Sequence, residues 1–183
     1  MNQVDLSTYD NSDFSIKAST MKAILWYVCN IFFFKNSLLV FYGIKRGLLR
    51  VFGAKVGRGV IIKPGVSIKY PWLLEVGEHS WIGERVWIDN LVPVKIGKHV
   101  CLSQGAMLLT GNHNYSKPTF DLMTREIELE DGVWIGAQAV VCPGVLARTH
   151  AVLSVGSIAT GELDAYQIYR GNPAEKVRER VIA

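Results

Sequence analysis

The sequence of 183 residues contains only three cysteines, and their placement excludes two common classes of small domain. Cys29, Cys101 and Cys142 are odd in number and widely spaced, so they indicate neither a disulfide framework nor a paired-cysteine metal site. The sequence also lacks a P-loop and a dinucleotide-binding glycine fingerprint, which excludes the commonest nucleotide-dependent folds. These absences favour a reduced protein in the cytoplasm.

Long apolar runs and basic runs are absent as well. The apolar segments AILWYVCNIFFF (23–34) and LLVFYGI (38–44) are each shorter than the roughly 18 to 20 residues that a spanning helix needs. The first residues, MNQVDLSTYD, lack the basic region of a secretory signal. The net charge is only +4, and no nucleic-acid-binding motif is present, so we expect no nucleic-acid partner.

The dominant positive feature is a six-residue period that extends from Val56 to Thr160. An apolar residue opens each hexad, at Val56, Ile62, Ile68, Val76, Ile82, Ile88, Ile96, Leu102, Leu108, Leu129, Ile135, Val141, Ala147, Leu153 and Ala159. Four residues later comes a small residue or valine, at Val60, Val66, Ser80, Val86, Val100, Ala106, Val133, Ala139, Val145, Ala151 and Ser157. Two inward positions per hexad predict flat, three-sided coils that stack into a parallel β-helix.

Interruptions of this period point to one edge of the predicted coils. Three hexads form a coil, and the coil starts at residues 56, 76, 96, 129 and 147 are separated by 20, 20, 33 and 18 residues. The surplus residues follow the third hexad each time, at 70–72, at 89–93 and after Leu109. Loops on a rigid scaffold commonly carry function, so we expect a site at this edge.

The longest interruption carries a histidine. It reads GNHNYSKPTFDLMTRE (111–126), and His113 stands where it leaves the coils. A neutral imidazole can accept a proton from a hydroxyl at physiological pH, so His113 is a candidate general base. The alternative is a loop histidine that only caps a turn.

Several motifs follow one another along the chain. They are LSTYDNSDF near the N-terminus, FGAKVG at Phe52, WIGERVWIDNLVPVKIG from Trp81, GNHNYSKPTFDL, GVWIGAQAVVCPGV and YRGNPAEKV. In this order they resemble the hexapeptide-repeat acetyltransferases, and the resemblance is closest to the colanic-acid-type exopolysaccharide branch. It extends over nearly the whole chain.

Together, the period and the resemblance predict an all-β protein. Its fold would be a left-handed parallel β-helix of about five triangular coils, with an N-terminal helical cap and a short C-terminal helical tail. The predicted boundaries are 1–50 for the cap, 51–165 for the β-helix with a catalytic loop at 111–127, and 166–183 for the tail. The resemblance alone implies the handedness, a homotrimer, and acetyl-CoA bound between neighbouring helices without a metal.

The resemblance also assigns roles to individual residues. His113 matches the family's catalytic histidine, which would deprotonate a sugar hydroxyl for direct attack on the thioester while a backbone N–H stabilises the oxyanion. Trp134 matches a tryptophan beside the cofactor arm, and Arg178 a basic residue near the CoA phosphates. The remaining positions matched to the cofactor groove are Ala137, Val155 and Thr160.

Two further pairs of residues permit alternative interpretations. We assign Asp89 and Asn90 to substrate binding, because Asp89 occupies the position of an acceptor-binding asparagine in galactoside-type relatives. A turn that satisfies its own backbone through Asx side chains is an equally good explanation. Trp81 and Trp87 each precede a hexad opening by one residue and so point outward, where a subunit interface is favoured over sugar stacking.

The apolar N-terminal part also permits two interpretations, which can coexist. The favoured one is a helical cap over the first coil. The other is an interfacial helix within residues 21–50, with its apolar side in the bilayer and its lysines and arginines near anionic head groups. The second would place the protein at the inner face of the cytoplasmic membrane.

The expected function is acetyl-CoA-dependent O-acetyl transfer to a sugar hydroxyl in exopolysaccharide or O-antigen assembly, on a free, nucleotide-linked or lipid-linked acceptor. An amino sugar acceptor would make the protein an N-acetyltransferase. A zinc carbonic anhydrase of the same architecture is a weaker alternative, because His79, His99 and His150 fall at a different corner from His113. A non-catalytic scaffold would not need the long loop.

Overall fold

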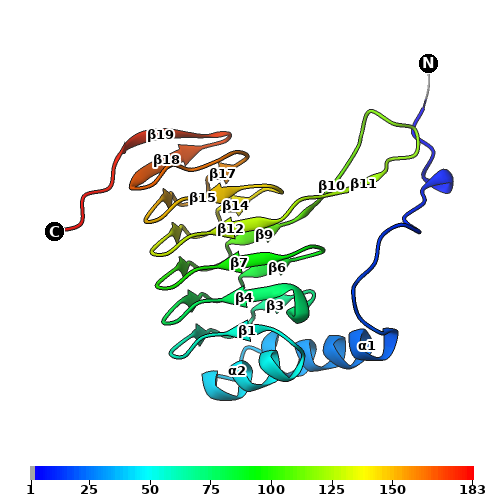
Figure 1. Cartoon of the computed structure of the whole chain (residues 1–183), viewed down its shortest axis with the longest axis horizontal. Helices are drawn as coiled ribbons and strands as arrows, with labels where there is room; N and C mark the ends of the chain where they lie inside the picture. Colours follow the sequence, from blue (N-terminus) through cyan, green and yellow to red (C-terminus); the bar gives the residue numbers. More distant parts are fainter. Residues whose placement is uncertain (1–2) are drawn as a thin grey trace.

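A computed structural model describes residues 3–183, in which a stack of triangular coils begins on a pair of helices (Figure 1). Sheet A comprises β1 (Lys55–Val56), β4 (Leu74–Val76), β7 (Val94–Ile96), β12 (Ile127–Leu129) and β15 (Leu146–Ala147). Sheet B comprises β2 (Ile61–Ile62), β5 (Trp81–Ile82), β8 (Cys101–Leu102), β13 (Trp134–Ile135) and β16 (Val152–Leu153), and then β18 (Gln167–Gly171). Sheet C comprises β3 (Ser67–Ile68), β6 (Trp87–Asp89), β9 (Met107–Leu109), β14 (Val140–Val141) and β17 (Ile158–Ala159). Strands of successive coils pair in parallel, which confirms the predicted β-helix.

The two inward registers of the period form the core. All the hexad-opening residues and all the residues of the second register are buried. They stack in register from coil to coil, as Val56, Val76 and Ile96 do along sheet A. Each buried Val, Ile or Leu side chain contributes about 1.5 to 3 kcal/mol relative to exposure, so the period itself supplies the main stabilising term.

The backbone conformation at one corner of the coils explains the positions of three of the four histidines. At the corner between sheets A and B, Gly59, His79, His99, Gly132 and His150 occupy equivalent places, and all have positive φ, between 55° and 71°. Glycine adopts this left-handed conformation freely, and histidine tolerates it better than most residues. The rings of His79 and His99 stack with centroids 5.5 Å apart, as the coil spacing predicts. Within the described residues, no group of three or more His, Cys, Asp or Glu could hold a metal ion.

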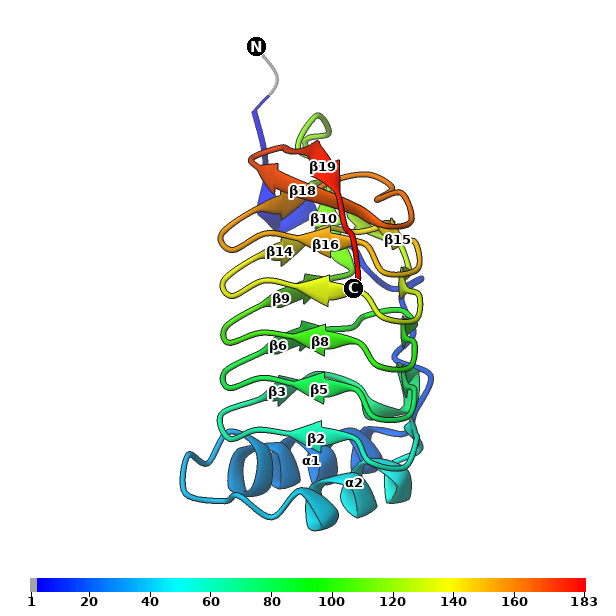
Figure 2. The same cartoon turned by 90° about the vertical axis from the view of Figure 1, so that its left-hand side faces the viewer.

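The helices lie at the open end of the first coil (Figure 2). They are α1 (Thr20–Cys29), which continues into the π-helical turn η2 (Asn30–Phe34), and α2 (Tyr42–Val51); the short 3-10 turns are η1 (Leu6–Thr8) and η3 (Pro71–Leu73). The Ser19 hydroxyl accepts a hydrogen bond from Lys22 N and caps the start of α1. No helix among residues 3–183 has the length and apolar character needed to cross a membrane.

Hydrogen bonding explains why the first coil needs this cap. Backbone N–H groups of each coil donate to the next coil, as Ile61 N does to Ser80 O at 3.0 Å, so the first coil directs its own carbonyl groups at the helices. Side-chain donors from the helices satisfy these carbonyls. They are Trp26 Nε1 to Ile68 O (2.9 Å), Lys45 Nζ to Lys63 O (3.0 Å), Arg46 Nη1 to Val60 O (2.8 Å) and Arg50 Nη2 to Val56 O (2.7 Å). The predicted helical cap is therefore confirmed, with donors as well as apolar contacts.

The predicted helical tail is wrong. β18 and β19 (Ala174–Glu179) form an antiparallel hairpin, and β18 also pairs in parallel with β16, so sheet B extends to a sixth coil. An unpaired strand edge at the end of a β-helix exposes backbone donors and acceptors. The hairpin provides partners for them, because Ser154 N of the last coil donates to Tyr169 O of β18 at 2.8 Å. The Gly171-Asn172-Pro173 sequence at the hairpin tip is a turn signal that argues against a helix.

Candidate active site

The excursions from the period leave the coils at one edge, between sheets C and A, as the spacing predicts. They are η3 after β3, the residues that follow β6, and an antiparallel hairpin after β9 formed by β10 (Gly111–His113) and β11 (Leu122–Thr124). The hairpin reaches away from the coils, and the N-terminal segment passes beside it (Figure 1). Asp5 N donates to Pro118 O at 2.9 Å and joins the two segments.

A cavity of about 360 Å³ lies at this edge and brings together His113 and Asp89. The N-terminal segment contributes Tyr9, Asn11 and Phe14 to its wall, and the Tyr9 ring centroid lies 5.8 Å from that of His113. These three residues belong to the LSTYDNSDF motif. Only the motif resemblance could have indicated that they lie near His113, because no periodicity links residues 9–14 to a loop a hundred residues later.

His113 is held in one orientation by its own loop. Its Nδ1 atom lies 2.9 Å from the carbonyl oxygen of Phe120, and the two rings stack with centroids 4.4 Å apart. A carbonyl can only accept, so Nδ1 carries the proton of this hydrogen bond. In the neutral imidazole, Nε2 then has the free lone pair that a general base requires.

Asp89 faces the same cavity with a charged partner. Its carboxylate forms an ion pair with Lys69 Nζ at 2.9 Å, and both residues line the cavity. The carboxylate side chain is about 20% exposed. Asp89 is therefore placed where it can accept a hydrogen bond from a ligand hydroxyl while Lys69 balances its charge.

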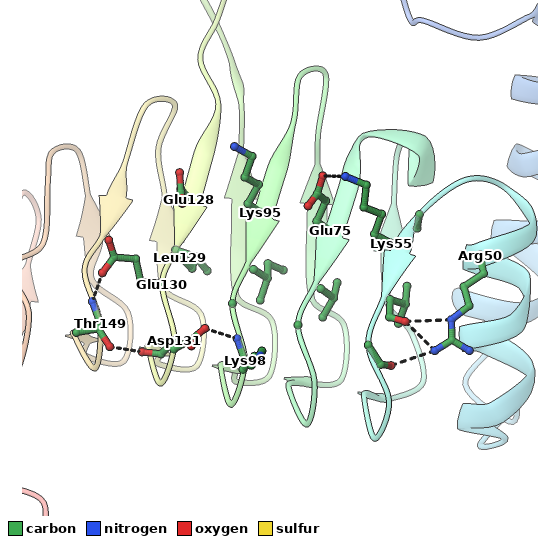
Figure 3. A pocket seen from close by; sticks show the side chains of 17 residues that line it. Arg50, Lys55, Glu75, Lys95, Lys98, Glu128, Leu129, Glu130, Asp131 and Thr149 are labelled. Carbon is green, nitrogen blue, oxygen red and sulfur yellow. Dashed lines mark hydrogen bonds and ion pairs between the residues drawn. The ribbon is translucent and has the colours of Figure 1, made fainter.

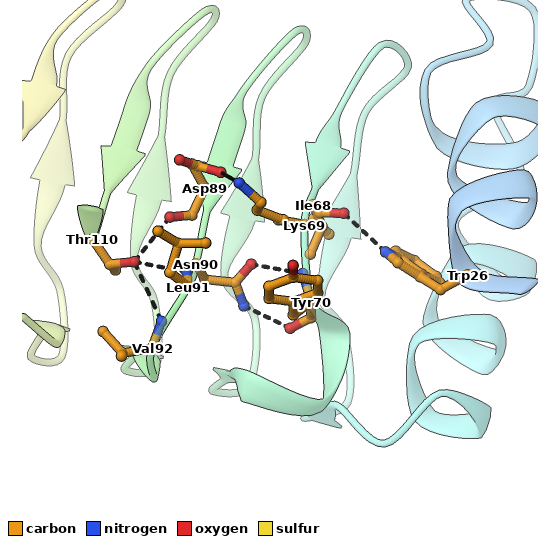
Figure 4. Close-up of polar contacts among 9 residues, drawn as sticks. All are labelled: Trp26, Ile68, Lys69, Tyr70, Asp89, Asn90, Leu91, Val92 and Thr110. Atoms are coloured by element: carbon orange, nitrogen blue, oxygen red, sulfur yellow. Dashed lines mark hydrogen bonds and ion pairs between the residues drawn. The ribbon is translucent and has the colours of Figure 1, made fainter. Parts of the chain in front are cut away.

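The substrate role assigned to Asn90 is wrong for this geometry. Asn90 is fully buried, its Oδ1 accepts from Tyr70 N at 3.0 Å, and its Nδ2 donates to Tyr70 O at 2.6 Å (Figure 4). The amide therefore completes the backbone of the preceding coil rather than facing the cavity. Thr110, also fully buried, has the same role in the next coil, because its hydroxyl donates to Asp89 O at 2.9 Å and accepts from Leu91 N at 2.8 Å.

A second cavity, a groove of about 430 Å³ on sheet B, contains most residues matched to cofactor binding. Trp134, Ala137, Val155 and Arg178 line it. Trp134 is half exposed, and its Nε1 donates to the Ser103 hydroxyl at 2.9 Å, so Ser103 fixes the orientation of the indole. Thr160 is exposed after β17, at the edge between sheets C and A, and does not line this groove.

The groove and the His113 cavity do not meet within one chain. They share no lining residue, and the groove lies on sheet B whereas the cavity lies at the edge between sheets C and A. The two cavities are thus separate features of the single chain.

A further hollow, of about 910 Å³, lies on sheet A and contains neither His113 nor Trp134 (Figure 3). Its outward side chains alternate in charge, with Lys55, Glu75, Lys95 and Glu128 opposite one another in register on four successive strands. Lys55 Nζ and Glu75 Oε1 are 2.7 Å apart. Such cross-strand pairs stabilise sheet register, and we assign this face to that role.

Comparison with known proteins identifies the family. The chain is 35% identical over 177 residues to a protein of Escherichia coli provisionally named colanic acid biosynthesis acetyltransferase WcaF, and the match covers 94% of this chain and 97% of that protein. The chain belongs to the hexapeptide-repeat acetyltransferases. This acetyltransferase matches none of the protein-family models in a scan of its sequence.

Solved structures show the same fold as this acetyltransferase. A hexapeptide-repeat acetyltransferase of Vibrio cholerae in complex with acetyl-CoA aligns with a TM-score of 0.77 at 20% identity, over 88% of this chain and 87% of that one. A galactoside acetyltransferase in complex with coenzyme A aligns with a TM-score of 0.77 at 21% identity, over 87% of this chain and 80% of that one. These structures confirm the predicted left-handed β-helix fold, and the 35% identity to the Escherichia coli protein confirms the predicted acyltransferase class.

Proposed function

We propose that this acetyltransferase transfers the acetyl group of acetyl-CoA to a hydroxyl of a saccharide acceptor in the assembly of an exopolysaccharide or O-antigen. The observation that carries the proposal is the His113 hydrogen bond to the Phe120 carbonyl, which leaves Nε2 as the free nitrogen of a residue that lines the same cavity as Asp89. The name of the WcaF relative supports the polysaccharide context.

The residues of the cavity suit an acceptor hydroxyl. His113 Nε2 would accept the hydroxyl proton as the hydroxyl oxygen bonds to the acetyl carbon. The bond from that carbon to sulfur breaks, and His113 returns the proton to the leaving thiolate, so the base is regenerated. Asp89 would accept a hydrogen bond from a second hydroxyl of the sugar, which orients the ring against His113.

The residues of the sheet B groove fit the acyl donor. Trp134, Ala137 and Val155 offer an apolar wall for the pantetheine arm, and the exposed Arg178 offers a positive charge for CoA phosphates. Acetyl-CoA supplies the activated thioester, and no metal is needed for attack by a deprotonated hydroxyl. Gly136 also lines the groove and lets the next coil approach closely, because a Cβ there would lie 2.5 Å from Val155 N.

A homotrimer would complete the site. The groove and the His113 cavity of one chain are separate, and a neighbouring chain placed beside it can bring a groove to each His113 loop. Trp81 and Trp87, which are 55% and 45% exposed, offer apolar surface for such side-by-side contacts.

Replacement of His113 tests the mechanism. The His113→Ala variant should lose about 10²- to 10⁴-fold in the rate of CoA release from acetyl-CoA with a pyranoside acceptor. The matched control is His99→Asn, because His99 occupies a left-handed corner that asparagine also tolerates. A His113→Ala trimer that turns over near the native rate would contradict the mechanism.

Analysis of the native polysaccharide tests the acceptor class. Mass spectrometry of material from cells with and without the enzyme should show the loss of one acetyl group. Release of that acetyl by mild alkali would identify an ester, whereas an alkali-stable acetyl would identify an amide and contradict O-acetylation.

A further inference from the structure

Charge is segregated along the molecule. Between Asp13 and Glu75 the sequence has ten lysines and arginines and no acidic residue, whereas the remaining residues include ten basic and sixteen acidic ones. The acid-free segment contains α1, α2 and the first coil. The cap end of the molecule, defined as residues 17–51, is therefore strongly basic, and the acidic residues lie toward the other end.

The same end exposes an unusual amount of apolar surface. Of the 25 large apolar side chains that are exposed within residues 3–183, 13 lie in residues 21–51. They are Met21, Ile24, Leu25, Tyr27, Val28, Ile31, Phe32, Phe33, Leu38, Val40, Phe41, Ile44 and Val51. A cap that only covered the first coil would need one apolar face, the one that packs on the coil. Residues 21–51 carry additional apolar side chains that are exposed.

Helix α1 and the turn after it are apolar on two opposite faces. The inner face carries Trp26, Cys29 and Phe34, which are buried against the first coil. At helical spacing, Met21, Leu25, Val28 and Phe32 form the outer face, and each is 46 to 71% exposed. Helices that are apolar all round are normally covered on every side, so the outer face indicates a partner.

The basic side chains of the cap end have no acidic partner in the part of the chain that the structure describes. Among the described residues, Lys17, Lys22, Lys35, Arg46 and Arg50 take part in no ion pair. Arg46 and Arg50 donate to backbone carbonyls of the first coil, so their guanidinium groups face the coil, whereas Lys17 and Lys35 are exposed. The partner of this face should therefore be apolar in its interior and anionic at its surface.

We propose that the cap end docks on an anionic lipid bilayer, with the outer face of α1 in the interfacial region and the exposed Lys17 and Lys35 at the head groups. A second copy is a poor partner, because two copies meeting at their cap ends would bring like charges together. Neighbours placed side by side in the proposed trimer leave this end uncovered. The proposed contact is peripheral, with α1 lying along the bilayer surface.

A groove connects the docked end to the proposed acceptor site. It has a volume of about 510 Å³ and starts beside α1 at Ile24 and Tyr27. Lys69, Tyr70 and Asp89 line both this groove and the His113 cavity. An acceptor presented at the membrane surface would therefore approach His113 from the cap end.

Vesicle co-sedimentation of the full-length protein tests the docking. We expect binding to vesicles in which about a third of the lipid is phosphatidylglycerol, and at least tenfold weaker binding to phosphatidylcholine alone. The double variant Lys17→Glu/Lys35→Glu should weaken binding to the anionic vesicles by about tenfold or more, since each charge near the surface contributes on the order of 1 kcal/mol. Val28→Ser/Phe32→Ser should weaken it comparably by removing inserted apolar area.

Matched controls place the same changes at other sites. Val181→Ser/Ile182→Ser and Lys98→Glu/Arg170→Glu alter exposed residues outside the cap and should bind as the native protein does. Melting temperature and mass in solution should stay constant for all variants. Equal binding by the cap variants and the native protein, or no binding to anionic vesicles, would overturn the proposal. So would a change of mass in Val28→Ser/Phe32→Ser without lipid, which would assign the face to contacts between copies. Acetyl transfer to a pyranoside in solution, measured in parallel, reports separately on the proposed function.

Discussion

The Nδ1 atom of His113 and the carbonyl oxygen of Phe120 are 2.9 Å apart, and the rings of the two residues stack. Phe120 adopts a left-handed conformation with φ of 51°, which turns its carbonyl back toward the hairpin. The loop thus supplies both the base and the group that fixes its tautomer. His113 and Phe120 are seven residues apart in the same loop, so the contact between them is formed within the loop.

Phe120→Ala should lower kcat by about tenfold, because His113 loses the ring that holds it in place. The KM for acetyl-CoA should stay unchanged, because Phe120 does not line the sheet B groove. Steady-state kinetics with Tyr115→Ala as the control separates this effect from general loosening of the loop, since Tyr115 is 78% exposed at the loop tip. A rise in the KM for acetyl-CoA without a change in kcat would contradict the positioning role.

Asp89 and Asn90, although adjacent, should respond to substitution in opposite ways. Asn90→Ala leaves the part-buried Tyr70 N–H unpaired and removes one of the two hydrogen bonds that Tyr70 O accepts, the other coming from Leu73 N, so it should lower the free energy of unfolding by about 1 to 3 kcal/mol. Asp89→Asn should leave the melting temperature nearly unchanged and raise the KM for the acceptor several-fold. Thermal unfolding and kinetics of both variants test this division, and a stable Asn90→Ala protein with impaired acceptor binding would reverse it.

The indole hydrogen bond of Trp26 should contribute to stability. Trp26→Phe removes the donor to Ile68 O while keeping an aromatic ring against Phe34 and Phe52, so we expect a loss of about 1 to 3 kcal/mol in the free energy of unfolding. Tyr27→Phe on the same helix is the control, because Tyr27 is 63% exposed. Denaturant unfolding measures both, and equal stabilities would show that water replaces the indole at the first coil.

Acid should loosen the tip of the catalytic loop. Hydrogen bonds from Lys117 and then Thr119 lower the pKa of Asp121, so the carboxylate stabilises the folded loop above the ordinary aspartate pKa of about 3.9. That contribution is lost as the pH falls through the lower, folded-state pKa. Asp121→Asn should mimic the acid form at neutral pH and increase amide hydrogen exchange at Asn114, whose N–H donates to Asp121 O. Asp10→Asn, which removes a similar exposed carboxylate bonded to Ser12, should leave exchange at Asn114 unchanged.

Much of the fold could be predicted because the β-helix is locally encoded. Each hexad repeats the same inward pair, so Ile62, Ile82 and Leu102 stack without any long-range information beyond the period. The helical tail was mispredicted because its structure is set by the unpaired edge of β16, which a local pattern does not reveal. The number of residues between coil starts predicts that the excursions leave from one edge. In the structure, Asp89 and His113 line one cavity at this edge.

The sequence by itself determined the coil, its core, the edge at which loops leave, and the family, because these depend on periodicity and motif order. The tertiary structure decided which side chains face the cavity. Asn90 and Asp89 are adjacent in sequence, yet one turns inward to the Tyr70 backbone and the other outward to Lys69. Tyr9 reaches His113 only because the N-terminal segment runs beside the loop. Such contacts depend on which backbone groups remain unpaired and which segments cover them, and this is known only once the chain is folded.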